Sequence, residues 1–138
     1  MDYLFDTNAL SELLRPRPNR RLVKWVSELH PARQFTSAVV VSELYAGAFR
    51  TPNRAKWLAR IVDDVLPRVQ VLPFDLVCAR ACGELDAYLS AKGGRIGRAD
   101  VEIAATALVH GMTLVTANLR HFERVPKLAL HAFVPGEQ

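Results

Sequence analysis

Two of the carboxylates in this sequence lie where ordinary surface positions do not account for them. Asp6 directly follows the apolar run Tyr3–Phe5, so we expect it at the end of a buried strand, with helix capping as the competing explanation. Glu43 shares a helical stripe with Val40 and Leu44. This pattern predicts an inward carboxylate, which is costly to bury unless a partner or a metal ion satisfies it. A helix rotated to place Glu43 on a boundary is the alternative.

A third acid, Asp100, lies in the first turn of an almost uncharged segment predicted to be helical over 98–110. The positive end of the helix dipole explains its position without a metal, but the same dipole keeps the carboxylate ionised, as a hard cation requires. Carboxylates that converge without a cation raise one another's pKa. Oxygen ligands without Cys or His favour Mg²⁺ or Mn²⁺ over zinc. The three acids therefore predict a metal site.

Basic residues surround these acids in segments predicted to be loops or helix ends. The formal net charge is +4, from 18 Lys and Arg against 14 Asp and Glu. Solvated surfaces explain any one basic group, but several together indicate a polyanionic partner. An acidic centre with a basic rim is typical of a metal-dependent nuclease. The side chains that we expect to contact nucleic acid are Arg15, Arg17, Arg20, Arg21, Arg98 and Arg120.

Apolar runs and helical stripes predict the elements that position these residues. Strands are expected at 3–5, from residue 35, and at 69–72, 112–115 and 128–133, and helices at 9–14, 22–29, 39–49, 54–66, 75–91 and 98–110. Alternation of this kind predicts an α/β fold with a parallel sheet covered on both faces. Ligands of such sheets bind at the carboxyl ends of the strands. With 138 residues, half of them hydrophobic, we expect one domain spanning residues 1–138.

The remaining features argue against other classes. Cys78 and Cys82 stand without further cysteines, so we expect core packing and no zinc site or disulfide framework. The uncharged stretch Ile103–Leu119 is too short and polar to span a membrane, and the start of the chain has no export signal. We therefore expect a cytoplasmic protein. The loop Gly93–Gly97 follows no strand and lacks the dinucleotide-binding glycine spacing, which leaves a nucleotide-binding domain with little support.

Four short motifs, in this order and spacing, resemble PIN-domain ribonucleases, and among them the VapC toxins of bacterial toxin–antitoxin pairs. They are Asp6-Thr7-Asn8, Ser42-Glu43-Leu44 with Gly47, Asp100 followed by Ile103-Ala104-Ala105, and Thr116 to Phe122. The resemblance extends over essentially the whole chain. It implies a Rossmann-like fold of three layers with about five parallel strands, a Mg²⁺ or Mn²⁺ cofactor, and endonucleolytic cleavage of RNA. It also implies a homodimer, a VapB-type antitoxin in the active-site groove, and contact with operator DNA only through that antitoxin.

The resemblance also assigns roles to residues. It implies that Asp6 and Asp100 are direct metal ligands and that Glu43 is a third carboxylate that positions water. It implies that Thr7 and Thr116 are hydroxyl supports, and that Asn118 is either a neutral oxygen ligand or a group that contacts the ligands from behind. Many relatives carry a further acid in the stretch that ends at Phe122, where this sequence offers Asn118 and His121. Glu123 lies just beyond this stretch, so the resemblance assigns no fourth carboxylate ligand. For His121, a phosphate contact and a surface position are the two alternatives.

Two other functions compete with RNA cleavage. The first is a catalytically weak PIN module that regulates operator DNA together with its antitoxin. The second is a phosphatase with Asp6 as nucleophile. The phosphatase is disfavoured because Asn8 replaces the second aspartate of such sites, and because Glu43 would then have no role.

Overall fold

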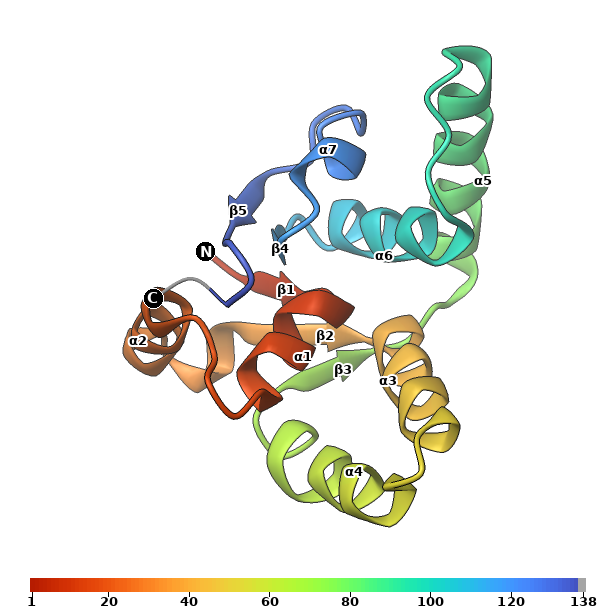
Figure 1. The fold of residues 1–138 in the computed structure, drawn as a ribbon. Coiled ribbons are helices and arrows are strands. Elements are labelled where there is room, and N and C mark those ends of the chain that lie inside the picture. Colours follow the sequence, from red (N-terminus) through yellow and green to blue (C-terminus); the bar gives the residue numbers. More distant parts are fainter. Residues whose placement is uncertain (137–138) are drawn as a thin grey trace.

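Five parallel strands form one sheet at the centre of the structure, a computed structural model that describes residues 1–136 (Figure 1). The strands are β1 (Tyr3–Phe5), β2 (Gln34–Ser37), β3 (Gln70–Leu72), β4 (Thr113–Thr116) and β5 (Leu130–Ala132). Their order in the sheet is β3-β2-β1-β4-β5, and every pair of neighbours runs parallel. The predicted α/β fold is therefore confirmed.

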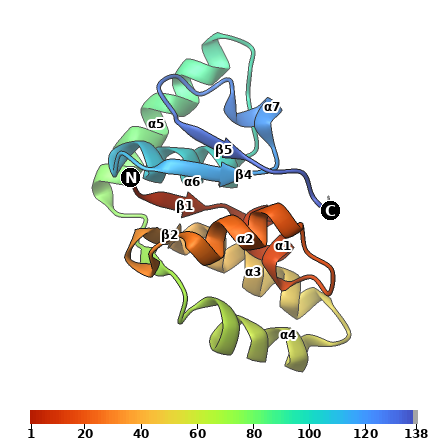
Figure 2. The same ribbon diagram turned by 90° about the vertical axis from the view of Figure 1, so that its left-hand side faces the viewer.

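Helices cover both faces of the sheet. They are α1 (Thr7–Leu14), α2 (Arg20–Glu28), α3 (Ala38–Arg50), α4 (Arg54–Arg60), α5 (Leu76–Ala91), α6 (Arg98–Val109) and the short α7 (Leu119–Phe122). Figure 2 shows α5 and α6 on one face and α1, α2 and α4 on the other. A 3-10 turn precedes β2, and a wider π turn, Ile61–Val65, continues α4. Three layers result, as expected for this class of fold.

Capping side chains start helices directly at, or just beyond, the carboxyl ends of three strands. Asp6 caps α1 by accepting a hydrogen bond from the Ala9 backbone N–H at 2.8 Å. Ser37 caps α3 in the same way, and Asp75 caps α5 shortly after β3. Each oxygen satisfies a backbone donor that the first helical turn leaves free. The carboxyl edge of the sheet is thus an edge of helix N-termini and polar side chains.

The core lies around the central strand β1 and its neighbour β4, which packs against α6. Leu4, Phe5, Leu114 and Val115 are fully buried. The part of α6 that faces the core includes small residues with no exposed surface, namely Ala104, Ala105 and Ala107. Their small side chains allow the helix to pack closely against the sheet. Cys78 and Cys82 are buried on α5 as free thiols, which confirms their predicted packing role. Among residues 1–136, no helix has the length and apolar character needed to cross a bilayer.

The observed elements differ from the predicted ones mainly at their ends. The helix predicted over 54–66 loosens into the π turn after Arg60, and β5 covers only Leu130–Ala132 of the predicted 128–133. β5 is an edge strand, so pairing with one neighbour alone defines its length. The helix α7 was not predicted, because four residues are too few for a periodic apolar stripe to show.

Candidate functional site

Asp6 lies at the carboxyl end of the central strand β1, as predicted, and only 3% of its surface is exposed. Its backbone N–H donates to the Val115 carbonyl at 3.1 Å, which continues the pairing of β1 with β4. Its carboxylate accepts the cap bond from Ala9 and a second hydrogen bond from the side chain of Thr116. The capping explanation and the site explanation therefore apply to the same carboxylate.

The electrostatics of Asp6 link the three acids. The pKa of Asp6 is raised from its ordinary value of 3.8 to about 6. Burial is the main cause, and the negative charges of Asp100 and Glu43 act in the same direction, against the hydrogen bonds from Thr116 and Ala9. The ion pairs among residues 1–136 do not include Asp6. A buried carboxylate influenced by two other acids is in an environment that a cation would stabilise.

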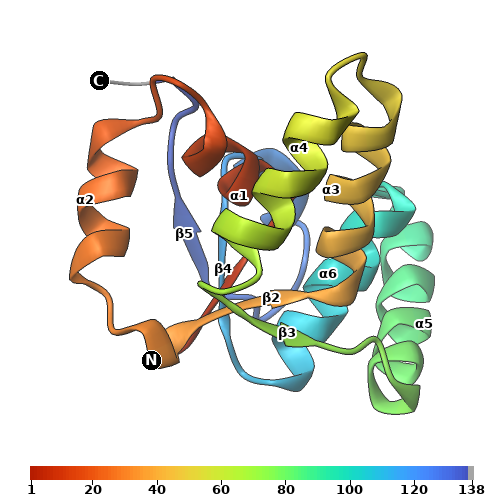
Figure 3. The same cartoon turned by 90° about the horizontal axis from the view of Figure 1, so that it is seen from below.

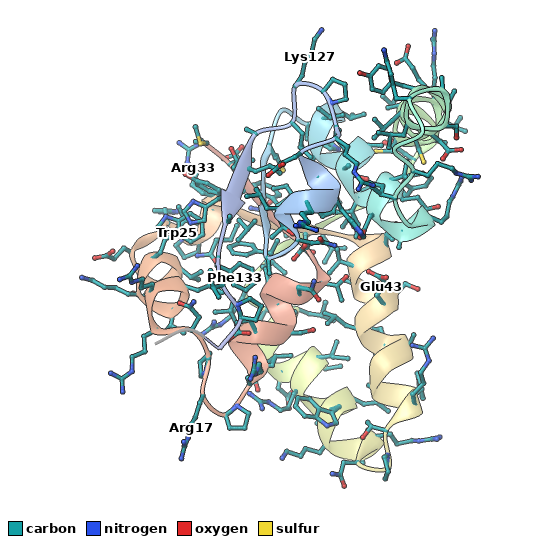
Figure 4. All side chains as sticks on the ribbon, turned by 45° about the horizontal axis from the view of Figure 1, so that its top comes forward. Arg17, Trp25, Arg33, Glu43, Lys127 and Phe133 are labelled. Carbon is teal, nitrogen blue, oxygen red and sulfur yellow. The ribbon has the colours of Figure 1, made fainter. Side chains whose placement is uncertain are left out.

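Glu43 lies in the first half of α3, at the boundary between core and solvent (Figure 4). Val40 and Leu44 are buried as expected, but Gly47 on the same predicted stripe is exposed. The prediction of an inward Glu43 was therefore wrong, because α3 is rotated so that this residue leaves the core. Its Oε1 instead accepts a hydrogen bond from the Thr7 hydroxyl on α1.

Asp100 is half-buried in the first turn of α6. Its Oδ2 is 3.1 Å from Nδ1 of His121, and the same nitrogen is 2.8 Å from Nδ2 of Asn118. The backbone N–H of Asn118 donates to the Thr116 hydroxyl at 2.9 Å. These contacts join the start of α6 to the turn that follows β4. The sequence left two roles open for His121, a contact with phosphate or a position on the surface. The one available signal for its contact with Asn118 was the spacing of three residues between them.

The side chains of the candidate site have the donor atoms that a hard divalent cation requires. Asp6, Glu43 and Asp100 offer carboxylate oxygens, and Thr116 and Asn118 offer neutral groups beside them. In residues 1–136, no three side chains of His, Cys, Asp or Glu lie close enough together to hold a metal ion. The chemistry of the donors and the uncompensated charge of Asp6 nevertheless fit Mg²⁺ or Mn²⁺.

A mainly apolar groove of about 410 Å³ opens beside Glu43. It runs between α1, α3 and the region of α4. Its walls include Thr7, Leu14, Leu44, Ala48, Trp57 and Ile61. Thr7 and Glu43 both line the groove, which therefore reaches this hydrogen-bonded pair.

The six arginines expected to contact nucleic acid are all exposed. Arg15 is paired with Glu12 at 3.1 Å, and Arg98 with Glu102 at 3.2 Å. Arg17 projects into solvent from the loop between α1 and α2 (Figure 4). Figure 3 shows α2, which carries Arg20 and Arg21, on the opposite side of the molecule from α3. The basic residues thus lie on more than one face: Arg15 lines the groove beside Glu43 and Arg98 shares the first turn of α6 with Asp100, whereas α2 lies on the opposite side from α3.

The comparisons with known proteins agree with this architecture. The PIN domain family model matches residues 3–128. The chain is 36% identical to VapC ribonuclease Y4jK of Sinorhizobium fredii, covering 87% of this chain and 89% of that protein. It is 33% identical to ribonuclease VapC2 of Haemophilus influenzae, covering 97% and 99%. The crystal structure of VapBC2 from Rickettsia felis bound to a promoter DNA fragment superposes with a TM-score of 0.88 at 28% identity, covering 96% and 99%. The chain belongs to the PIN-domain family.

Proposed function

We propose that this protein is a metal-dependent endoribonuclease and the toxin of a toxin–antitoxin pair, with residues 1–138 forming one PIN domain. The observation that carries the proposal is the buried carboxylate of Asp6, whose pKa of about 6 reflects its burial and the nearby charges of Asp100 and Glu43. Relatives that match nearly the whole chain are named ribonuclease VapC. An RNA phosphodiester is therefore the substrate class that fits both the family and the acids.

Asp6 and Asp100 are the side chains that would hold Mg²⁺, or Mn²⁺ in its place, with Glu43 as the third carboxylate. When bound, the cation supplies an acidified water and neutralises charge on the phosphate. Glu43, held by the Thr7 hydroxyl, orients the attacking water and takes up its proton. Thr116 supports Asp6, and Asn118 is connected to Asp100 through His121. In-line attack of this water on phosphorus would break the bond between phosphorus and the 3′ oxygen, and protonation of that oxygen leaves 5′-phosphate and 3′-hydroxyl ends.

The exposed arginines would bring RNA to this acidic site. The candidates are Arg15, Arg17, Arg20, Arg21, Arg98 and Arg120. Binding through phosphates is sequence-independent and weakens with salt. Since Arg15 and Arg98 already pair with acids, we expect the unpaired side chains on and before α2 to contribute more.

A VapB-type antitoxin is the partner that we propose for the groove beside Glu43. The groove is mainly apolar, and both Thr7 and Glu43 line it, so a segment lying in it would block access to Glu43. The R. felis relative was crystallised as a VapBC complex on promoter DNA. By analogy, this chain would form a homodimer, act in the cytoplasm, and contact operator DNA only through its antitoxin.

RNA cleavage by the purified chain tests the proposal. With Mg²⁺ present, Asp6→Asn and Asp100→Asn should abolish cleavage of single-stranded RNA while the circular dichroism spectrum stays unchanged. Asp63→Asn, at an exposed acid on the π turn, is the matched control and should cleave normally. Full activity of either site variant would contradict the assignment. Folded wild-type protein that never cleaves RNA would favour the regulatory PIN module instead.

A phosphatase has less support in the structure. Asp6 is buried and both caps a helix and accepts from Thr116, which ties up the carboxylate that would have to attack phosphorus. Asn8 is exposed. Trapping of a labelled phospho-enzyme would reinstate this function.

A further inference from the structure

In the described part of the chain, His121 is the one cationic or potentially cationic side chain that touches a site acid. Among residues 1–136, the hydrogen bonds and ion pairs of Asp6, Glu43 and Asp100 include a single His, Lys or Arg partner, which is His121 on Asp100. It lies on α7, and the acid lies in the first turn of α6. The contact therefore spans two elements that no helix or strand pairing connects.

The proton on the imidazole determines what this contact can do. A carboxylate oxygen only accepts hydrogen bonds, so a separation of 3.1 Å between Nδ1 and Oδ2 of Asp100 is favourable when Nδ1 carries hydrogen. Two N–H donors repel at 2.8 Å, so the Asn118 amide must then turn its oxygen toward Nδ1. We assign this arrangement, in which Nδ1–H is shared between Asp100 and Asn118.

The hydrogen bond restricts the orientation of the Asp100 carboxylate. The side chain of Asp100 is 28% exposed, and its position in the first helical turn does not by itself fix the rotation of the carboxylate about its last bond. A bond to Oδ2 selects one orientation and leaves Oδ1 for another ligand. Hydrogen-bonded partners behind metal ligands commonly serve this purpose.

We propose that His121 is a positioning residue of the metal site, which holds Asp100 by Oδ2 so that Oδ1 binds the divalent cation. His121 itself does not bind the cation. The inference rests on the proposed function, because it requires Asp100 to be a metal ligand. It assigns a use to the position where the resemblance to relatives would place an acid and where this chain has none.

The test measures Mn²⁺ binding directly, from the electron paramagnetic resonance signal of the free ion. His121→Phe keeps a ring but removes both nitrogens, whereas His121→Asn places an amide N–H near the position of Nδ1. Removal of such a partner typically weakens metal affinity by about 10- to 100-fold. We expect that loss for the Phe variant and recovery of most of the affinity for the Asn variant. His110→Phe, just beyond the other end of α6, is the matched control and should bind as the wild type does.

Cleavage rates provide a second measurement. Because positioning acts through affinity, raising the Mn²⁺ concentration should restore most of the RNA cleavage rate of His121→Phe. Wild-type Mn²⁺ affinity in His121→Phe would overturn the inference. An equal loss in the Phe and Asn variants would also overturn it, because a nitrogen ligand would then explain the data. A cleavage rate that stays low at saturating Mn²⁺ would contradict a role through affinity.

The design separates this inference from the proposed function. If Asp100→Asn abolishes Mn²⁺ binding but His121→Phe leaves it unchanged, only the role of His121 fails. If Asp6→Asn and Asp100→Asn both bind Mn²⁺ as the wild type does, the ion binds elsewhere and the proposed metal site fails. Melting curves in EDTA should be the same for wild type and both His121 variants, since the half-exposed side chain makes little contribution to the core.

Discussion

The hydroxyl of Thr7 donates a hydrogen bond to Oε1 of Glu43, which connects the first residue of α1 to the middle of α3. Glu43 lies at the boundary of the core, where water competes for its carboxylate. The bond from Thr7 therefore restricts an otherwise movable side chain. Both residues also line the groove beside α4.

Replacing Thr7 should reduce catalysis without unfolding the protein. Thr7→Val keeps the shape of the side chain and removes the hydrogen-bond donor. Loss of one hydrogen bond costs about 0.5–1.5 kcal/mol. We therefore expect kcat on single-stranded RNA to decrease by up to about 10-fold. Thr7→Ser keeps the hydroxyl and should retain most of the activity. Equal activity in the Val and Ser variants would show that the orientation of Glu43 does not depend on this bond.

Without metal, Asp6 should destabilise the fold at neutral pH. Burial raises the pKa of Asp6 from 3.8 to about 6, so its protonated form favours the folded state. That stability is fully present below pH 3.8 and is lost as the pH rises through 6. The upper limit of the effect is about 3 kcal/mol, at 1.36 kcal/mol per unit of pKa. In EDTA, Asp6→Asn should raise the melting temperature at pH 8 and raise it less at pH 4.5.

The comparison of two pH values is the control for this effect. Asparagine can still accept the cap bond from Ala9, so the helix start is preserved in the variant. A variant that melts lower than the wild type at pH 8 would mean that the ionised carboxylate stabilises the apoprotein after all.

Glu12 should be a major stabilising residue that does not belong to the proposed metal site. Its buried carboxylate accepts hydrogen bonds from the backbone N–H of Asn19 at 2.8 Å and of Gly136 at 3.0 Å, and from Arg15 at 3.1 Å. Burial alone would raise the pKa of Glu12, but the hydrogen bonds from Gly136, Asn19 and Arg15 outweigh it and lower the pKa. This stability is present above the unfolded pKa and is lost as the pH falls through the lower, folded value.

We therefore expect Glu12→Gln to lower the free energy of unfolding by about 1.5–3 kcal/mol at pH 7, because hydrogen bonds to a charged acceptor lose that charge. Urea titrations at pH 7 and pH 4 measure the difference, which should be smaller at pH 4. Glu28→Gln, at an exposed acid at the end of α2, should change neither value. A Glu12→Gln effect that is larger at pH 4 than at pH 7 would contradict the direction of the pKa shift.

Charge removal on α2 should change the salt dependence of RNA binding. In the double variant Arg20→Ala and Arg21→Ala, each lost phosphate contact reduces the slope of log K against log salt by about 0.7 for a single strand. Fluorescence anisotropy of catalytically inactive Asp6→Asn protein with labelled RNA measures it. The matched control is Arg33→Ala with Arg68→Ala, at the amino-terminal edge of the sheet. Equal slopes of log K against log salt in the two double variants would mean that α2 is an ordinary solvated surface that does not bind RNA.

The order of elements could be predicted because the buried strands and helical stripes alternate clearly. Asp6 and Asp100 could be placed for the same reason: one follows a strand and the other starts a helix, and local pattern determines both positions. The rotation of α3 could not be predicted. It depends on how α3 packs against α1 and α6, and those contacts moved Glu43 to the boundary.

The role of His121 could not be predicted either. The residue is 21 positions from Asp100, and only the folded turn after β4 brings the two together. Likewise, the spacing of basic residues suggested one rim, whereas the crossover from β1 to β2 places α2 on the opposite side of the molecule from α3. Long-range packing, which leaves little trace in local spacing, determined both outcomes.

The two roles of Asp6 also determine how different substitutions at this position affect the protein. Since one carboxylate starts α1 and belongs to the proposed metal site, an alanine there would remove the helix cap along with catalysis, whereas asparagine would preserve the cap. Under selection for survival without antitoxin, asparagine at this position yields an inactive but intact protein. Such a protein would still bind the antitoxin. A single-base change from Asp to Asn would therefore give an inactive toxin that competes with the active toxin for the same antitoxin.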